Sequence, residues 1–197
     1  MKTEMITLKH GDASIKMPAS SLAKLAIASV FAQVLPPAEN VQPVASTEAP
    51  AVGEYWTGQG GINAGYVAAR GNVPAHYLIF GDKDLGEFKW GRYQEESAAT
   101  SKWDGRANTD ALIAAGGHPA AEAARAHTAD GHSDFDLPAA TQLHQAWAHD
   151  LIAKGAYWSS SQRSADYAFT MHFGVGRQND TDELSELRVR PVRRFFI

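Results

Sequence analysis

Residues 36–52, PPAENVQPVASTEAPAV, divide this chain into two parts, because such a stretch suits neither a helix nor a strand. Four prolines stand among small residues, and no hydrophobic period runs through them. The stretch therefore predicts an extended linker. A short N-terminal segment, residues 1–35, precedes it, and residues 53–197 follow with the length of one ordinary domain.

The N-terminal segment predicts a β-hairpin followed by a helix. MITLKHGDASIKM alternates in polarity around a turn at residues 10–12, and Pro18 then precedes an apolar stripe over residues 22–34. Lys24 interrupts this stripe, which favours an amphipathic helix over a signal peptide. Because one hairpin and one helix cannot bury a core alone, the stripe is expected to pack on the main domain or on copies of itself.

Composition excludes several classes of protein. A net charge of −4 and a pI near 6.0 argue against nucleic-acid binding as the main activity. The chain has no cysteine, which excludes disulfides, thiolate zinc sites and thiol catalysis. No stretch is long and apolar enough to predict membrane insertion. The basic run RVRPVRRFF alternates with apolar residues, which predicts a strand with one polar face rather than a phosphate-binding patch.

The order of elements after the linker predicts an α+β domain. Four segments in the first half of the domain have the pattern of strands: GEYWT, the segment after GQGGINAG, HYLIFGD and the short EFKWGRY. Three helices are expected in ANTDALIAAGG, HPAAEAARAH and LPAATQLHQAWAHDLIAK. Strands are expected again after the helices, in YWSSS, DYAFTMHFGVG and LRVRPVRRFF. Pro191 within the last of these indicates an edge strand or a bulge. Strands that flank a block of helices are typical of the α+β class.

Neither a catalytic site, a metal site nor a cofactor is predicted. The glycines of GQGGINAG do not open a helix after a strand, so they are interpreted as turn residues. The serines at 159–161 lack a nucleophile elbow, and hydroxyls that bond the local backbone explain them better. His132 and Asp134 leave a metal or catalytic cluster conceivable, but no metal-binding spacing occurs.

The stretch DGHSDFDLPAATQLHQAW has a purely structural explanation. Asp130-Gly131 forms a turn, Asp136 or a neighbour helps to cap the following helix, and Leu137 packs as a hydrophobic staple.

Six segments then occur in a fixed order: GEYWTGQGG, WDGRANTDAL, HPAAEAA, DGHSDFDLP, YWSSSQRSADYAF and VRPVRRF. Together they resemble the Lcl C-terminal domain family, which has no known function and is frequent in phage, prophage and bacterial surface proteins. The resemblance covers residues 53 to about 196. The family is similar to the C-type-lectin-like fold of formylglycine-generating enzymes and of the variable proteins of diversity-generating retroelements.

The resemblance implies an architecture and limits the activity. A twisted antiparallel sheet with flanking helices is expected, in which the first strand, around 53–57, pairs with the last, around 188–196. Formylglycine-generating enzymes use cysteines, so their activity does not carry over to this chain. The sugar-binding motifs of calcium-dependent lectins are absent too, so no bound metal is expected.

The resemblance also implies a binding face. The strand YWSSS would anchor Tyr157 and Trp158 in the core, and the polar crest SQRSADY would meet the later loop GRQNDTDELSE at this face. Tyr, Arg, Ser and Asn on a rigid scaffold suit recognition. The candidate ligand-binding residues are Ser160, Gln162, Arg163, Tyr167, Arg177, Gln178, Asn179 and Asp180.

The function that follows is a non-enzymatic phage virion protein, made in the bacterial cytoplasm and associated with the tail. It would bind a host-surface receptor and other tail proteins. A homotrimer is favoured because the tail-tip and fibre proteins that it resembles are often trimeric. Two alternatives stay open: a decoration protein that binds only virion subunits, and an enzyme acting on glycans or polypeptides through the His/Asp cluster.

Overall fold

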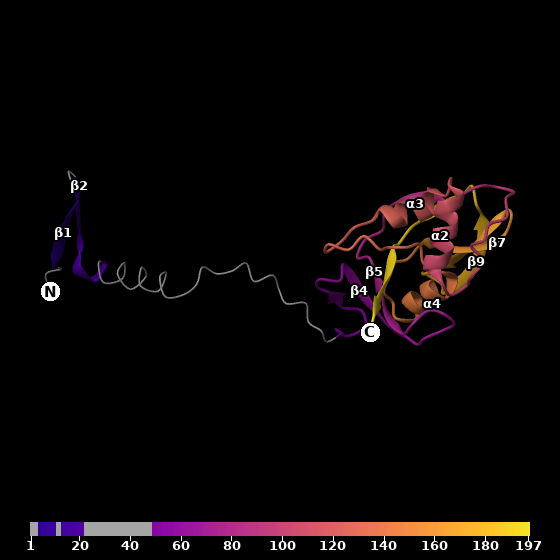
Figure 1. The fold of residues 1–197 in the computed structure, drawn as a ribbon, viewed down its shortest axis with the longest axis horizontal. Coiled ribbons are helices and arrows are strands. Elements are labelled where there is room, and N and C mark those ends of the chain that lie inside the picture. Colours follow the sequence, from indigo (N-terminus) through magenta and orange to yellow (C-terminus); the bar gives the residue numbers. More distant parts are fainter. Residues whose placement is uncertain (1–3, 11–12, 22–48) are drawn as a thin grey trace. The chain divides into compact units, whose positions relative to one another are not determined.

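The structure, a computed structural model, describes residues 4–10, 13–21 and 49–197, and the chain divides into two compact units, residues 1–44 and 45–197. In the first unit β1 (Met5–His10) pairs antiparallel with β2 (Ala13–Pro18), as the alternation predicts. The expected stripe over residues 22–34 and the linker as far as residue 48 lie outside the described residues. Figure 1 shows the path of the chain.

The second unit confirms the α+β class and contains two sheets. The four-stranded sheet has the order β11-β5-β4-β3 and is antiparallel throughout. The five-stranded sheet has the order β6-β10-β7-β8-β9, in which only the β10–β7 contact is parallel. The strands are β3 (Tyr55–Trp56), β4 (Gly61–Val67), β5 (His76–Phe80), β6 (Glu87–Lys89), β7 (Ala156–Ser164), β8 (Tyr167–His172), β9 (Arg177–Asp182), β10 (Glu186–Arg188) and β11 (Val192–Phe196).

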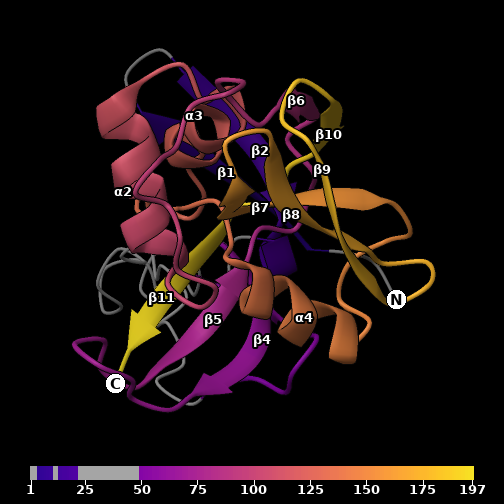
Figure 2. The same ribbon diagram turned by 90° about the vertical axis from the view of Figure 1, so that its right-hand side faces the viewer.

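Three helices lie between β6 and β7 in the sequence: α2 (Gly105–Ala115), α3 (Pro119–Ala126) and α4 (Ala140–Ala148). Asp104 caps α2 by accepting from Ala107 N–H, so the caps expected from ANTDAL lie several residues too late. Figure 2 shows α2 and α3 together on one side of the five-stranded sheet and α4 between this sheet and the strands β4 and β5. The helices therefore fill the space between and beside the two sheets.

Strand β7 holds the core together because its successive side chains point to opposite faces. Tyr157 packs with α4 and Phe173, whereas Trp158 packs with α2, α3 and Trp90. Tyr157 and Trp158 are both fully buried, as expected. The indole Nε1–H of Trp158 donates to the Phe88 carbonyl at 2.8 Å, so its polar atom is satisfied inside the core.

Two expectations about strands are wrong. The first strand does not pair with the last: β3 pairs with β4 and β11 pairs with β5, so two strands separate them in the same sheet. Only their side chains approach, with the Trp56 and Phe195 rings 4.9 Å apart. The expected loop GRQNDTDELSE instead contains the edge strand β9 and continues into β10. Charged residues suit an exposed edge strand because they discourage further pairing, and this makes β9 look like a loop in the sequence.

The basic C-terminal run is not the single strand with one polar face that its alternation predicts, because the adjacent Arg193 and Arg194 of β11 point to opposite sides of the strand. Pro191 separates β10 from β11, and the arginines of this run point to aspartates on different loops. Three of them are buried in the protein. Each therefore ties the last strand to a separate part of the chain. The pairs are Arg190–Asp84 (2.9 Å), Arg193–Asp134 (2.7 Å) and Arg194–Asp104.

The segment DGHSDFD is also structural, though partly in another way than expected. The Asp130 carboxylate accepts from Tyr55 Oη and from the backbone N–H groups of Gly58 and Gly60, which fixes the turn beside β3. Asp136 does not cap α4, because its carboxylate pairs with Arg125 at 2.6 Å. Within the described part of the chain, no helix is long and apolar enough to cross a membrane.

Candidate functional site

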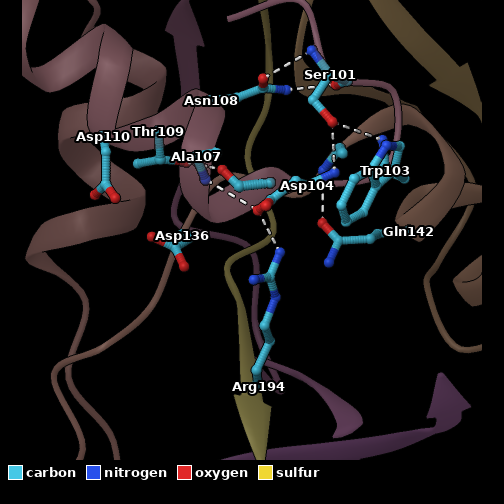
Figure 3. Close-up of polar contacts among 12 residues, drawn as sticks. Ser101, Trp103, Asp104, Ala107, Asn108, Thr109, Asp110, Asp136, Gln142 and Arg194 are labelled. Atoms are coloured by element: carbon cyan, nitrogen blue, oxygen red, sulfur yellow. Dashed lines mark hydrogen bonds and ion pairs between the residues drawn. The ribbon is translucent and has the colours of Figure 1, made fainter. Parts of the chain in front are cut away.

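The loop of residues 101–104, which leads into α2, is fixed by buried polar side chains. Asn108 donates to the Ser101 carbonyl at 2.6 Å and accepts from Ser101 N–H at 3.0 Å. Ser161 of β7 donates to the same carbonyl at 2.7 Å. Ser101 Oγ in turn accepts from the N–H groups of Trp103 and Asp104 (Figure 3). The loop conformation, and with it the position of Trp103, is therefore set by contacts to two other elements.

Trp103 stands between two hollows in the surface. One is a pocket of about 120 Å³, bounded by the β4–β5 loop, β5 and α4. The other is a more open hollow of about 390 Å³ beside the N-terminus of α2, lined by Asn72, Ser101 and Asp104 among others. The guanidinium of Arg70 lies 4.9 Å from the centre of the Trp103 ring. A half-buried aromatic ring with a hollow on each side is a suitable platform for a ligand.

The pocket lining combines apolar and polar side chains. Apolar side chains of the β4–β5 region, Leu78 and Trp103 form the walls. Two buried polar side chains, His76 and Gln142, line it as well. Gln142 Oε1 accepts from Ala139 N–H at 2.8 Å, which leaves its Nε2 without a hydrogen-bond partner among the described residues. The amide nitrogen is therefore available to donate to a ligand.

His76 provides the complementary group. Its Nδ1 lies 2.8 Å from the Pro74 carbonyl, and since a carbonyl only accepts, Nδ1 carries the proton and Nε2 is an acceptor. Burial lowers the pKa of His76, which is consistent with a neutral ring at pH 7. Gln142 Nε2 and His76 Nε2 thus add a donor and an acceptor to a lining that also contains Arg70, Thr141 and Gln145 among its apolar residues.

Asp104, which lines the open hollow, forms an ion pair with Arg194. The same carboxylate oxygen of Asp104 caps α2 and pairs with Arg194 of β11 (Figure 3). Both side chains are largely buried, with exposed fractions of 15% and 8%. The pair therefore connects the last strand to the loop that carries Trp103.

A second exposed cluster continues from this loop onto β8. The Lys102 ammonium lies 5.6 Å from the Phe169 ring centre, and the Arg163 guanidinium lies 5.8 Å from it. Arg163 also donates to Asp180 of β9 at 2.9 Å. Because Lys102 directly precedes Trp103, the Phe169 cluster and the Trp103 hollows are linked by adjacent residues. We call this surface, defined by Arg70, Lys102, Trp103, Arg163, Phe169 and Asp180, the contact face.

The structure corrects two of the predicted ligand-binding residues. Ser160 is fully buried, and its N–H donates to the Pro138 carbonyl at 2.8 Å. Gln162 is 5% exposed and holds the loop of residues 91–98 by donating to the Glu95 carbonyl and accepting from Ser97 N–H. These two residues of the polar crest are buried because loops cover this part of β7, and the backbone groups of those loops need hydrogen-bond partners.

The other six predicted residues are at least partly exposed, but they do not all converge. Arg163 and Asp180 meet, as described above. Tyr167 pairs with Asp182 at one end of the β8–β9 hairpin, and Arg177 pairs with His172 at the other. At about 3.3 Å per residue, these ends lie about 17 Å apart. Gln178 and Asn179 lie between them on β9, so the expected single cluster of Tyr167 and Arg177 is wrong.

The His/Asp cluster is held by structural contacts. Asp134 accepts from Arg193 at 2.7 and 3.2 Å; although burial acts in the opposite direction, this ion pair lowers the pKa of Asp134. The Nε2 of His132 lies 2.9 Å from the Gly58 carbonyl. Among residues 4–10, 13–21 and 49–197, no group of three or more His, Cys, Asp or Glu side chains is arranged to hold a metal ion.

Sequence reasoning missed Trp103 and its two hollows. The pocket and the open hollow draw their lining from the β4–β5 loop, β5, the loop before α2 and α4, which are separated by many residues. One local signal was present: a tryptophan inside the polar turn sequence SKWDG has few apolar neighbours to pack against.

No protein-family model matches the chain, and no curated protein is significantly similar to it.

A buried carboxylate near the crest gives a testable pH dependence. Glu183 is fully buried; its Oε1 accepts from Gln162, and its Oε2 has no partner among the described residues. Burial raises the pKa of Glu183 to about 7, and nearby carboxylates add to this effect although the Gln162 hydrogen bond opposes it. The folded state thus holds a proton more tightly than the unfolded chain does. The stability contributed by this group is present below about pH 4.5 and decreases as the pH rises towards 7.

We expect Glu183→Gln to stabilise the protein at pH 8 by roughly 1–3 kcal/mol, because one pKa unit corresponds to about 1.4 kcal/mol. The gain should shrink towards zero near pH 4.5. Urea denaturation of the wild-type protein and the Glu183→Gln variant at several pH values measures this difference in the free energy of unfolding. Glu186→Gln, which changes an exposed carboxylate nearby, should show no such pH dependence. A constant difference across the pH range would contradict the assignment.

Proposed function

We propose that this chain is a phage virion protein, associated with the tail, that binds a host-surface receptor through a C-type-lectin-like domain. The class of protein is proposed from the order of the segments over residues 53 to about 196, which resembles a phage-associated family although no family model matches the chain. The observation that carries the binding role is Trp103, held by buried contacts at the surface between two hollows. A rigid aromatic residue surrounded by arginine, lysine and polar groups has the composition of a binding hot spot.

Two features favour binding over catalysis in this proposal. The His132 and Asp134 side chains, which an enzyme of the alternative type would need, are engaged in contacts that anchor loops. The serines at 159–161 are fully buried and bond the backbone and Asn108, so they are not placed as nucleophiles. The partners in this proposal are other tail proteins and the receptor, and a homotrimer is the favoured assembly.

Attachment to host cells tests the proposal. The full chain with both Trp103→Ala and Arg163→Ala should bind cells of the infected bacterium more than tenfold more weakly, which corresponds to about 1.4 kcal/mol or more. Flow cytometry with the fluorescently labelled protein measures this binding. Arg177→Ala is the matched control, since it removes an exposed arginine from the far end of the β8–β9 hairpin.

Two outcomes separate the alternatives. Immunogold labelling should place the chain on the tail of particles released from the bacterium that carries the gene. If the chain is found on the particle but binds no host cell, a decoration protein replaces the proposal. If Arg177→Ala weakens attachment as much as the double variant, the contact face is not the receptor site.

A further inference from the structure

The pocket beside Trp103 has unused hydrogen-bonding groups that specify the chemistry of its ligand. Gln142 Nε2 is a donor and His76 Nε2 an acceptor, and both residues are buried in the pocket lining with their other polar atoms engaged. A group that satisfies both must itself accept one hydrogen bond and donate another. A carboxylate offers acceptors only, so it could bond Gln142 and Arg70 of the lining but would leave the His76 acceptor without a donor.

The size and the apolar side chains of the pocket narrow the choice of ligand group further. The pocket has a volume of about 120 Å³, which suits a small group rather than a whole sugar ring or a large side chain. Val67, Val73 and Leu78 contribute apolar surface to it. A secondary amide that ends in a methyl group fits all three demands: its carbonyl accepts, its N–H donates, and its methyl contacts the apolar walls.

The surroundings of the pocket favour a saccharide as the carrier of this amide. Trp103, at the rim, lines both hollows, so a ring bound over it would continue into the open hollow of about 390 Å³. Asn72, Ser101 and Asp104 line that second hollow and offer polar groups to hydroxyls. Aromatic rings with nearby hydrogen-bonding side chains recognise ligands that are apolar on one face and polar at the edge.

We propose that the Trp103 pocket binds the acetamido group of an N-acetylated amino sugar, with the sugar ring against Trp103. This inference rests on the proposed receptor-binding function and names the chemical class of the receptor. In this proposal Gln142 and His76 bind the acetamido group, Trp103 contacts the sugar ring, and Asn72, Ser101 and Asp104 offer polar groups to its hydroxyls.

Two trisaccharides that differ only at one position of each sugar ring test the proposal. The full chain should bind the β1,4-linked trisaccharide of N-acetylglucosamine at least tenfold more tightly than the β1,4-linked trisaccharide of glucose, which has a hydroxyl in place of each acetamido group. Isothermal titration calorimetry measures both affinities. Resonances of the Trp103 indole and of the Gln142 side-chain amide should shift with the first sugar in NMR spectra. Equal affinities, or shifts elsewhere only, overturn the proposal.

Sugar binding by variants of the pocket residues is the second test of the proposal. Gln142→Glu keeps the acceptor for Ala139 N–H and removes the donor, so binding of the acetamido sugar should fall at least tenfold. Trp103→Ala should have a similar effect, whereas Trp147→Ala, at a partly exposed tryptophan outside the pocket, should not. NMR spectra of the free variants establish that they are folded. Retained sugar binding by folded Gln142→Glu and Trp103→Ala proteins overturns the inference.

The experiments distinguish an error in the saccharide assignment from an error in the proposed receptor-binding function. If Trp103→Ala abolishes attachment to host cells but neither trisaccharide binds, the receptor-binding function stands and the saccharide assignment is wrong. If a peptide with an acetylated lysine binds the pocket while the sugars do not, the receptor is a protein. If the acetamido sugar binds as expected but attachment is unaffected by Trp103→Ala, the pocket is a sugar site and the receptor role is wrong.

Discussion

Trp158→Ala is expected to lower the free energy of unfolding by about 3–5 kcal/mol, the usual cost of truncating a large buried aromatic side chain. Trp158 is fully buried among α2, α3 and Trp90, and its Nε1–H bonds the Phe88 carbonyl at 2.8 Å. The variant loses this apolar burial, leaves a cavity beside two helices and leaves the carbonyl without its donor. Denaturant titration followed by circular dichroism measures the change.

Arg163→Ala, five residues along the same strand, provides the matched control. Its side chain is 55% exposed and pairs with Asp180 on the surface, so its loss should cost less than about 1 kcal/mol. The ratio of the two effects compares the buried part of β7, residues 157–162, with its exposed end at Arg163. Equal shifts in the denaturant midpoint would contradict this difference in burial along the strand.

The contrast between these two residues shows what the sequence could predict about the domain. Strongly apolar elements are recognisable locally, so β5, α3 and the aromatic start of β7 agree with their patterns. The register that buries Tyr157 and Trp158 could be inferred because aromatic residues in a central strand have few other places to go. These local signals place the elements and the core but do not say which strands are neighbours.

The pairing of the terminal strands was wrong for this reason. Whether β11 lies beside β3 or beside β5 depends on contacts between residues far apart in the chain, such as Phe195 opposite Tyr77. Strand β9 escaped detection because its sequence, RQNDTD, contains no apolar residue. An edge strand that faces solvent on its open side needs none, so hydrophobic periodicity cannot reveal it.

The candidate site could be predicted only in part, and the buried serines explain why. The sequence predicts that the hydroxyls after Trp158 bond the local backbone, but most of their partners are distant in the chain, such as the Ser101 carbonyl for Ser161. Ser160 and Gln162, expected on the binding face, are buried. The loops that cover them come from residues 91–98 and 101–104, which the sequence does not place near β7. Polar residues in a strand thus indicate either solvent or a covering loop, and only the tertiary structure distinguishes the two.

Arg194→Ala is expected to have an effect of similar size to that of Trp158→Ala, for an electrostatic reason. Arg194 is 8% exposed and pairs with Asp104, which is 15% exposed and also caps α2. Removing one partner of a buried ion pair leaves the other charge uncompensated, which typically costs about 3–5 kcal/mol. The free energy of unfolding from urea denaturation at pH 7 gives the result.

A double-mutant cycle separates the ion pair from the loss of packing. Asp104→Asn keeps a side-chain oxygen that can cap α2 but removes the charge. In Arg194→Met with Asp104→Asn, no uncompensated charge remains, so the double variant should be more stable than Arg194→Met alone. Additive losses would show that the two side chains act independently. Because Asp104 follows Trp103 directly, Arg194→Met alone should also weaken ligand binding at the contact face, whereas the double variant should recover part of it.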